Sequence, residues 1–133
     1  AQKYDGPMHC TSPEVLGLAA QWSFWAMLEV EHLLLNLLEH RALLAEFARD
    51  ASAVERNELL LKKPLSVLND ALAGSDYLAG NSFTVADLNV ASILVWGKMA
   101  RLDFSAYPNL TRWLNACLAR PAFIRVRDQA RRK

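Results

Sequence analysis

A short segment in the second half of the chain, Leu-Ala-Gly-Asn-Ser-Phe-Thr-Val-Ala-Asp, contains the signals for the start of a buried helix. Thr84 is a favourable N-cap residue, and Asp87 can accept a hydrogen bond from its backbone N–H, which closes a variant of the capping box. Phe83 and Leu88 take the two positions of a hydrophobic staple. The residues that follow, 85–99, are nearly all apolar, so the first turn needs partners other than water. The segment therefore predicts a capped, buried helix with these four side chains as structural residues.

The length and composition are those of one helical domain. The chain has 133 residues, 53% of them apolar, with five glycines and five prolines. It can bury roughly two thirds of its unfolded surface, and neither disorder nor a strand-and-turn protein fits well. No apolar run reaches the roughly 18 residues that span a bilayer, and no charged-then-apolar signal segment opens the chain. We expect a soluble, cytoplasmic protein with no membrane partner.

Motifs for metal binding or nucleophilic catalysis are absent from the sequence. Cys10 and Cys117 stand far apart and form no C-x-x-C pair, so we expect two ordinary thiols. The histidines His9, His32 and His40 do not complete a metal-ligand set with them. There is no Gly-rich phosphate loop and no G-x-S-x-G elbow. We therefore predict no metal and no catalytic residue in this chain.

The remaining pattern predicts an all-α protein, a helical array of four to six helices. Ser12 as N-cap and Pro13 at the first helical position begin a segment that reaches about residue 48, as one long helix or two in succession. Further helices are expected over about 53–73, 85–101, from 107 onward, and 121–130. Pro64 lies inside the helix expected over about 53–73 and predicts a kink or a break near Lys63. We find no period-two strand and no internal repeat.

The first long segment has two different faces at about 100° per residue. One face is apolar and is expected in the core; it consists of Leu16, Ala20, Met27, Leu34 and Leu38, with Phe24 and Leu35 beside them. The opposite stripe is aromatic and polar; it consists of Gln21, Trp22, Trp25, Glu29, His32, Asn36 and His40. Glu31 interrupts the apolar face, where an isolated charge is costly. We expect Glu31 to have an arginine partner or to lie at an interface.

From about Tyr4 to Val126 the chain resembles the C-terminal all-helical domain of cytosolic, bacterial-type glutathione S-transferases. Tyr-Leu-Ala-Gly at 77–80 and Phe-Thr-Val-Ala-Asp at 83–87 resemble that family's capping box and staple. Tyr-Pro-Asn-Leu at 107–110, Trp113 and Arg-Pro-Ala at 120–122 resemble its closing pattern. Each motif is weak alone, but their order and spacing are specific. The Trp-bearing first helix is similar to bacterial members.

The resemblance implies a partner domain that 133 residues do not contain. Complete members have an N-terminal thioredoxin-like domain, which carries the residue that activates the glutathione sulfur. Residues 1–12 resemble a remnant of the interdomain linker, 13–130 the helical domain, and 131–133 a basic tail. A truncated or excised domain and a natural free-standing domain both remain open. The resemblance further implies glutathione as co-substrate, bound mainly by the absent domain, and a homodimeric parent.

The candidate substrate-binding residues are Trp22, Trp25, Glu29, His32 and Trp96. By resemblance, the middle of the first helix and parts of the capped helix form the wall that faces a small hydrophobic electrophile. Indole faces suit such a wall, but two tryptophans three residues apart also suit packing against another domain or subunit. Glu29 either reaches the amino end of glutathione, as an acidic residue does in some classes, or lies on a solvated helix face. Trp96 faces either the core or the cleft.

The charge distribution is uneven although the net charge is only +1. Residues 112–133 carry seven basic groups against Asp128 alone. Such an end can bind nucleic acid, or it can complement helix C-termini and form a solvated tail. Without interleaved aromatic residues or a nucleic-acid-binding fold, the sequence favours the solvated tail, and we predict no nucleic-acid partner.

The leading functional prediction is the substrate-side domain of a transferase that conjugates glutathione to electrophilic small molecules, a detoxification activity. The isolated chain is predicted to be inactive because it lacks the thiol-activating domain. The alternative is a non-catalytic helical interaction module, like the transferase-type domains attached to translation factors. A small-ligand carrier that uses the tryptophan stripe is a third possibility.

Overall fold

The computed structural model describes residue 6, residue 8, residues 12–130 and residue 132. These residues form helices joined by turns, with no strand among them, which confirms the predicted all-α fold. The expected linker over 1–12, with His9 and Cys10, lies largely outside the described residues, as does most of the tail over 131–133. In chain order the elements are α1 (Pro13–Trp25), η1 (Ala26–Glu31), α2 (His32–Leu38), η2 (Glu39–Leu43), η3 (Glu46–Ala48), α3 (Ala51–Ala71), α4 (Val85–Met99), α5 (Pro108–Leu118) and α6 (Pro121–Ala130).

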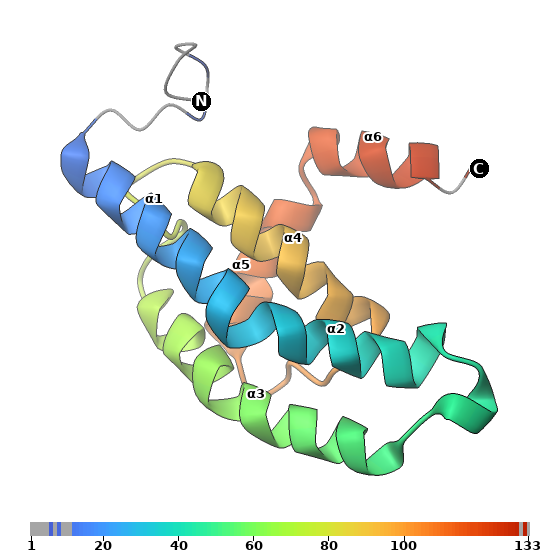
Figure 1. The fold of residues 1–133 in the computed structure, drawn as a ribbon. Coiled ribbons are helices and arrows are strands. Elements are labelled where there is room, and N and C mark those ends of the chain that lie inside the picture. The colour runs from blue at the N-terminus through green and yellow to red at the C-terminus, as the bar shows by residue number, and fades with distance from the viewer. Residues whose placement is uncertain (1–5, 7, 9–11, 131, 133) are drawn as a thin grey trace.

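The helical segment from Pro13 to Leu43 is one continuous rod, which we call the first helix (Figure 1). It is π-helical over Ala26–Glu31 in its middle and over Glu39–Leu43 at its end. Ser12 caps its start by accepting from the backbone N–H of Val15, as predicted. The rod ends earlier than the expected residue 48, because Leu44 turns to an extended conformation. The single-helix alternative is therefore correct, with a shorter C-terminal end.

Four helices enclose one apolar core. The α1–α2 rod packs against α4 on one side and α3 on the other, and α5 packs against both α3 and α4 (Figure 1). The largest fully buried side chains come from these helices and the turn after α3; they are Trp113, Leu34, Leu37, Leu61, Leu65, Leu68, Leu72, Leu94, Leu110, Leu114, Val30 and Val90. By contrast, α6 has no buried residue and lies at the edge of the bundle.

The predicted core face of the first helix is wrong over its N-terminal half. Phe24 is 62% exposed and Met27 is 56% exposed, and Leu16, Ala20 and Leu35 are exposed as well. Leu34 and Leu38 are buried as expected, whereas Ala19, Trp22, Ala26 and Val30 take the core positions in the first half. Each π-helical stretch has more residues per turn than an α-helix, so a constant 100° step does not follow one face along the whole rod. The first half of the helix is also apolar on nearly every side, so the spacing of apolar residues does not single out one buried face.

The second long helix, α3, runs unbroken from Ala51 to Ala71, so of the kink or break predicted near Lys63 the break does not occur. Pro64 lies buried inside it, next to the fully buried Leu65 and one turn from Leu68. A proline in a helix interior removes one backbone hydrogen bond and costs about 3 kcal/mol. Burial of this apolar face against the first helix and α5 offsets that cost.

Both helices that follow are capped by specific side chains. Thr84 and Asp87 form the predicted capping box at the start of α4. The N-cap residue of α5, Tyr107, makes no side-chain cap. Instead Asn69 of α3 accepts from the backbone N–H groups of Asn109 and Leu110 at 3.0 and 3.3 Å. This cap comes from another helix, so local sequence could not reveal it.

Among the described residues, no helix is both long and apolar enough to cross a membrane.

Candidate functional site

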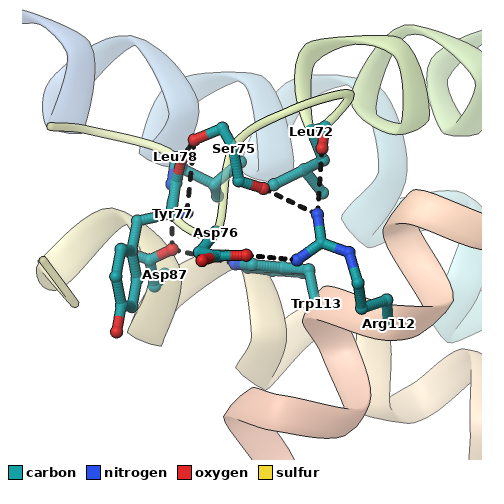
Figure 2. Close-up of polar contacts among 8 residues, drawn as sticks. All are labelled: Leu72, Ser75, Asp76, Tyr77, Leu78, Asp87, Arg112 and Trp113. Atoms are coloured by element: carbon teal, nitrogen blue, oxygen red, sulfur yellow. Dashed lines mark hydrogen bonds and ion pairs between the residues drawn. The ribbon is translucent and has the colours of Figure 1, made fainter. Parts of the chain in front are cut away.

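The Asp87 carboxylate is the most completely engaged polar group of the fold. It is fully buried and accepts four hydrogen bonds (Figure 2 shows two of them). Oδ2 accepts from the backbone N–H and the hydroxyl of Thr84 at 2.9 and 3.2 Å. Oδ1 accepts from the backbone N–H of Leu78 at 3.0 Å and from Trp113 Nε1 at 2.9 Å. One carboxylate thus joins the α3–α4 connection, the start of α4 and the middle of α5.

The neighbouring residue on α5, Arg112, holds the other end of the same connection. Its guanidinium pairs with Asp76 and donates to the carbonyl oxygens of Leu72 and Ser75 at 3.1 and 2.7 Å (Figure 2). Arg112 therefore binds the turn that ends α3, and Trp113 binds the residue that starts α4. Sequence reasoning missed these partners of Asp87; the one usable signal was Trp113, because a buried indole N–H usually has an acceptor.

The closing Arg-Pro-Ala motif also contacts the capping segment. The guanidinium carbon of Arg120 lies 3.8 Å from the centre of the Phe83 ring, a cation–π contact. Phe83 packs against the core, whereas Leu88, its predicted staple partner, is exposed. The two family motifs are thus in direct contact, through Asp87 with Trp113 and through Phe83 with Arg120.

Cys117 lies beside this network and is a buried, free thiol. Burial, with the Asp87 carboxylate as a second cause, raises the pKa of the Cys117 thiol to about 12. The thiol therefore stays protonated at neutral pH and is a poor nucleophile.

We expect this thiol to be inert in the native protein. In a Cys10→Ser variant, the reaction of Cys117 with a disulfide reagent at pH 8 should be slower by on the order of a thousandfold than in the urea-unfolded chain, because so little thiolate is present. The measurement is the rate of thiol release with and without urea. Native modification at a rate near that of the unfolded chain would contradict the assignment.

The predicted substrate stripe on the first helix is only partly accessible. Trp22 is 8% exposed, and Trp25 is partly buried and packs against the core. Their ring centroids are 5.3 Å apart with an interplanar angle of 75°, an edge-to-face pair. The two indoles thus contact each other and the protein interior, which leaves less of their surface for a ligand.

Glu29 and His32 are exposed, and within the described part of the chain neither makes a side-chain hydrogen bond or an ion pair. Further along the same stripe, Asn36 accepts from Asn57 of α3, and His40 accepts from the backbone N–H of Asp50. The C-terminal end of the stripe is therefore directed toward α3. Glu31 is half-buried and takes part in none of the three ion pairs of the described residues, so the expected arginine partner is absent there.

Trp96 belongs to α4, which contacts the first helix. In α4, Asn89 donates to Ser23 Oγ of α1 at 3.0 Å, which marks where the two helices touch. Trp96 is seven residues after Asn89, on the same helical row, and is half-buried. Like Trp25, Trp96 packs against the core, and among the described residues no aromatic pair joins it to Trp22 or Trp25.

The helices α1 and α4 run side by side (Figure 1), and several exposed side chains, most of them apolar, belong to these two helices. We call the surface along their line of contact the α1–α4 seam; helical spacing around the Ser23–Asn89 contact assigns to it Leu16, Ala20, Met27, Ser92, Trp96 and Met99. Apart from the half-buried Trp96, these residues are exposed. Exposed apolar side chains gathered along one pair of helices are a candidate binding or interaction site.

The described residues contain no group of three or more side chains arranged to hold a metal ion. Two open hollows are present: one of about 390 Å³ between α3 and the connection from α4 to α5, and one of about 510 Å³ lined by Arg41 and by Met99 of the seam. Neither is lined by a predicted substrate-binding residue.

Comparisons with known proteins agree with this fold. The family model described as "Glutathione S-transferase, C-terminal domain" matches residues 26–121. A glutathione S-transferase of Hyoscyamus muticus is 40% identical over 76 residues, which cover 56% of this chain and 36% of that protein. Elongation factor 1-gamma of Danio rerio is 32% identical over 81 residues, which cover 59% of this chain and 18% of that protein.

Among solved structures, Ure2p5 of Phanerochaete chrysosporium, cocrystallized with 1-(S-glutathionyl)-2,4-dinitrobenzene, superposes with a TM-score of 0.83 at 21% identity. The match covers 98% of this chain and 64% of that one. The chain therefore matches about a third of the length of the Hyoscyamus relative and less than two thirds of this solved structure.

Proposed function

The chain belongs to the glutathione S-transferase C-terminal domain family, and from that premise we propose that it is the electrophile-binding side of a transferase. The parent enzyme conjugates the glutathione thiol to a small hydrophobic electrophile. Glutathione itself is held mainly by a preceding thioredoxin-like domain, and the parent is a cytoplasmic homodimer with a detoxification role. The structural relative crystallized with a glutathionyl-dinitrobenzene conjugate supports this substrate class.

The observation that carries the proposal is the exposed apolar α1–α4 seam. A surface of Met27, Trp96 and Met99 side chains can cover one side of an aromatic or aliphatic electrophile and keep water from it. It contributes shape and desolvation, while the sulfur is activated by another domain. In this proposal Trp96 is the substrate-facing tryptophan. Trp22 and Trp25 pack against each other and against the core. The exposed side chains of Glu29 and His32 remain able to contact glutathione or a partner.

Activity and binding measurements on the 133-residue chain test the proposal. We expect no meaningful turnover of a generic aryl halide with glutathione. An apolar aryl ligand should quench the tryptophan fluorescence, to which Trp96 is one of four contributors, and Met27→Glu should weaken this quenching. Val67→Glu, which introduces the same charge on the exposed face of α3, is the matched control and should leave it unchanged. Turnover comparable to that of a whole enzyme, or equal quenching in both variants, would contradict the proposal.

The similarity to elongation factor 1-gamma favours a second candidate, a non-catalytic helical interaction module. The reading frame upstream of Ala1 separates the two candidates. A thioredoxin-like domain encoded there supports the transferase, whereas a start site there supports the module. Quenching by apolar ligands without any glutathione-dependent activity of the complete gene product would support the third possibility, a ligand carrier.

A further inference from the structure

The turn between the first helix and α3 is closed by one hydrogen bond to a histidine ring. The backbone N–H of Asp50 donates to His40 Nδ1 at 3.0 Å. Asp50 is the N-cap of α3, and its carboxylate accepts from the backbone N–H and the hydroxyl of Ser52. His40 lies in the π-helical end of the first helix. The bond therefore ties the end of one long helix to the beginning of the other.

This bond exists only while the His40 ring is neutral. A neutral imidazole has one nitrogen that accepts and one that donates, whereas the protonated ring has two donors and no acceptor. Histidine side chains ordinarily take up their proton between about pH 5 and 8. The bond is consequently present while the ring is neutral and is lost when the ring takes up a second proton.

Several charged groups lie near His40. Glu39 and Arg41 are its neighbours on the first helix, Arg41 is paired with Glu58 of α3, and Arg49 donates to the carbonyl oxygen of Leu44. The Ser52 side-chain and backbone hydrogen bonds lower the pKa of Asp50, so this carboxylate stays ionised throughout the range. A protonated ring can move toward the Asp50 carboxylate, but the Asp50 N–H still loses its acceptor.

The segment that this bond closes has an unusual surface. Phe47, in the short helix η3 of this segment, is 94% exposed. Leu43, four residues earlier in the chain, is also exposed. Over residues 44–49 the other hydrogen bonds are also local: Leu44 N donates to Glu39 O, Ala48 N to Ala45 O, Arg49 N to Glu46 O, and Arg49 Nε to Leu44 O. We propose that His40 and the Asp50 N–H form a pH-sensitive latch, closed when His40 is neutral, that controls the order of the apolar turn over residues 44–49.

The test is amide hydrogen exchange of Asp50 by NMR, expressed as a protection factor so that the intrinsic pH dependence of exchange is removed. Between pH 8 and pH 5 we expect the protection of Asp50 to fall by about three- to tenfold, the effect of losing one hydrogen bond. His40→Asn keeps a side-chain acceptor that does not titrate and should abolish the pH dependence. His40→Ala should leave the amide weakly protected at every pH.

His32→Ala is the matched control, because His32 is an exposed histidine on the same helix with no side-chain hydrogen bond in the described part of the chain. It should behave as the wild type. Nitrogen chemical shifts of the His40 ring give an independent reading, since the latch requires the proton on Nε2 at high pH. A pH-independent wild type, an unprotected Asp50 amide at pH 8, or a His40→Asn variant that follows the wild type would overturn the proposal.

Discussion

Replacing Asp87 by alanine is expected to destabilise the fold by about 3 to 5 kcal/mol, or to prevent folding. The substitution leaves the backbone N–H groups of Leu78 and Thr84 and the indole N–H of Trp113 without their acceptor. Each unsatisfied buried donor costs about 1 to 3 kcal/mol. Urea unfolding followed by circular dichroism measures the loss, with the far-ultraviolet signal reporting whether a folded population remains.

Two other substitutions distinguish the loss of the Asp87 hydrogen bonds from the loss of a negative charge. Asp87→Asn keeps one acceptor oxygen and should lose less than Asp87→Ala. Asp103→Ala removes an exposed aspartate that binds Ser105 in a similar short turn, and it should cost less than about 1 kcal/mol. If Asp87→Ala were no more costly than Asp103→Ala, the central role of the buried carboxylate would be wrong.

The second large effect is expected at Trp113, which is almost fully buried and reaches Asp87 from α5. Trp113→Ala should cost about 3 to 5 kcal/mol, because it creates a cavity and removes the indole donor. Trp113→Phe retains most of the apolar volume and isolates the hydrogen bond, at about 1 to 3 kcal/mol. The free energy of unfolding in urea measures both.

A double-mutant cycle shows whether the two residues act as a pair. Because Trp113 Nε1 donates to Asp87 Oδ1, the costs of Trp113→Phe and Asp87→Asn should not add. We expect a coupling of about 0.5 to 3 kcal/mol between them, and strict additivity would refute a direct interaction. Leu118→Ala on the same helix is a control that removes partly buried apolar volume without touching the network.

The start of α4 could be predicted from the sequence because its capping residues are close together in the chain. Thr84 and Asp87 are three residues apart, so helix geometry alone brings them into hydrogen-bond distance. The other partners of Asp87 are Leu78, nine residues away, and Trp113, 26 residues away. Those contacts depend on how α5 packs against α4, which no local pattern reveals.

The faces of the first helix were harder to predict for two physical reasons. Phe24 and Met27 are as apolar as the residues that are actually buried, so hydrophobicity does not identify the core side. The π-helical stretches then rotate the later residues relative to a regular helix. Trp96 was grouped with Trp22 and Trp25 for another reason, the family resemblance, which places parts of the capped helix in the same wall.

The two long connections of the domain differ in how they are held, and this decides where the chain can be divided. A break between Ala45 and Glu46 would leave every contact of Asp87 and Arg112 inside one fragment. A break at Gly80 would put Leu78 and Asp87 on separate chains and divide the network. The turn after the first helix is therefore the natural site for fragment complementation, with the long first helix supplied in trans to a fragment that carries α3–α6 and keeps this network intact.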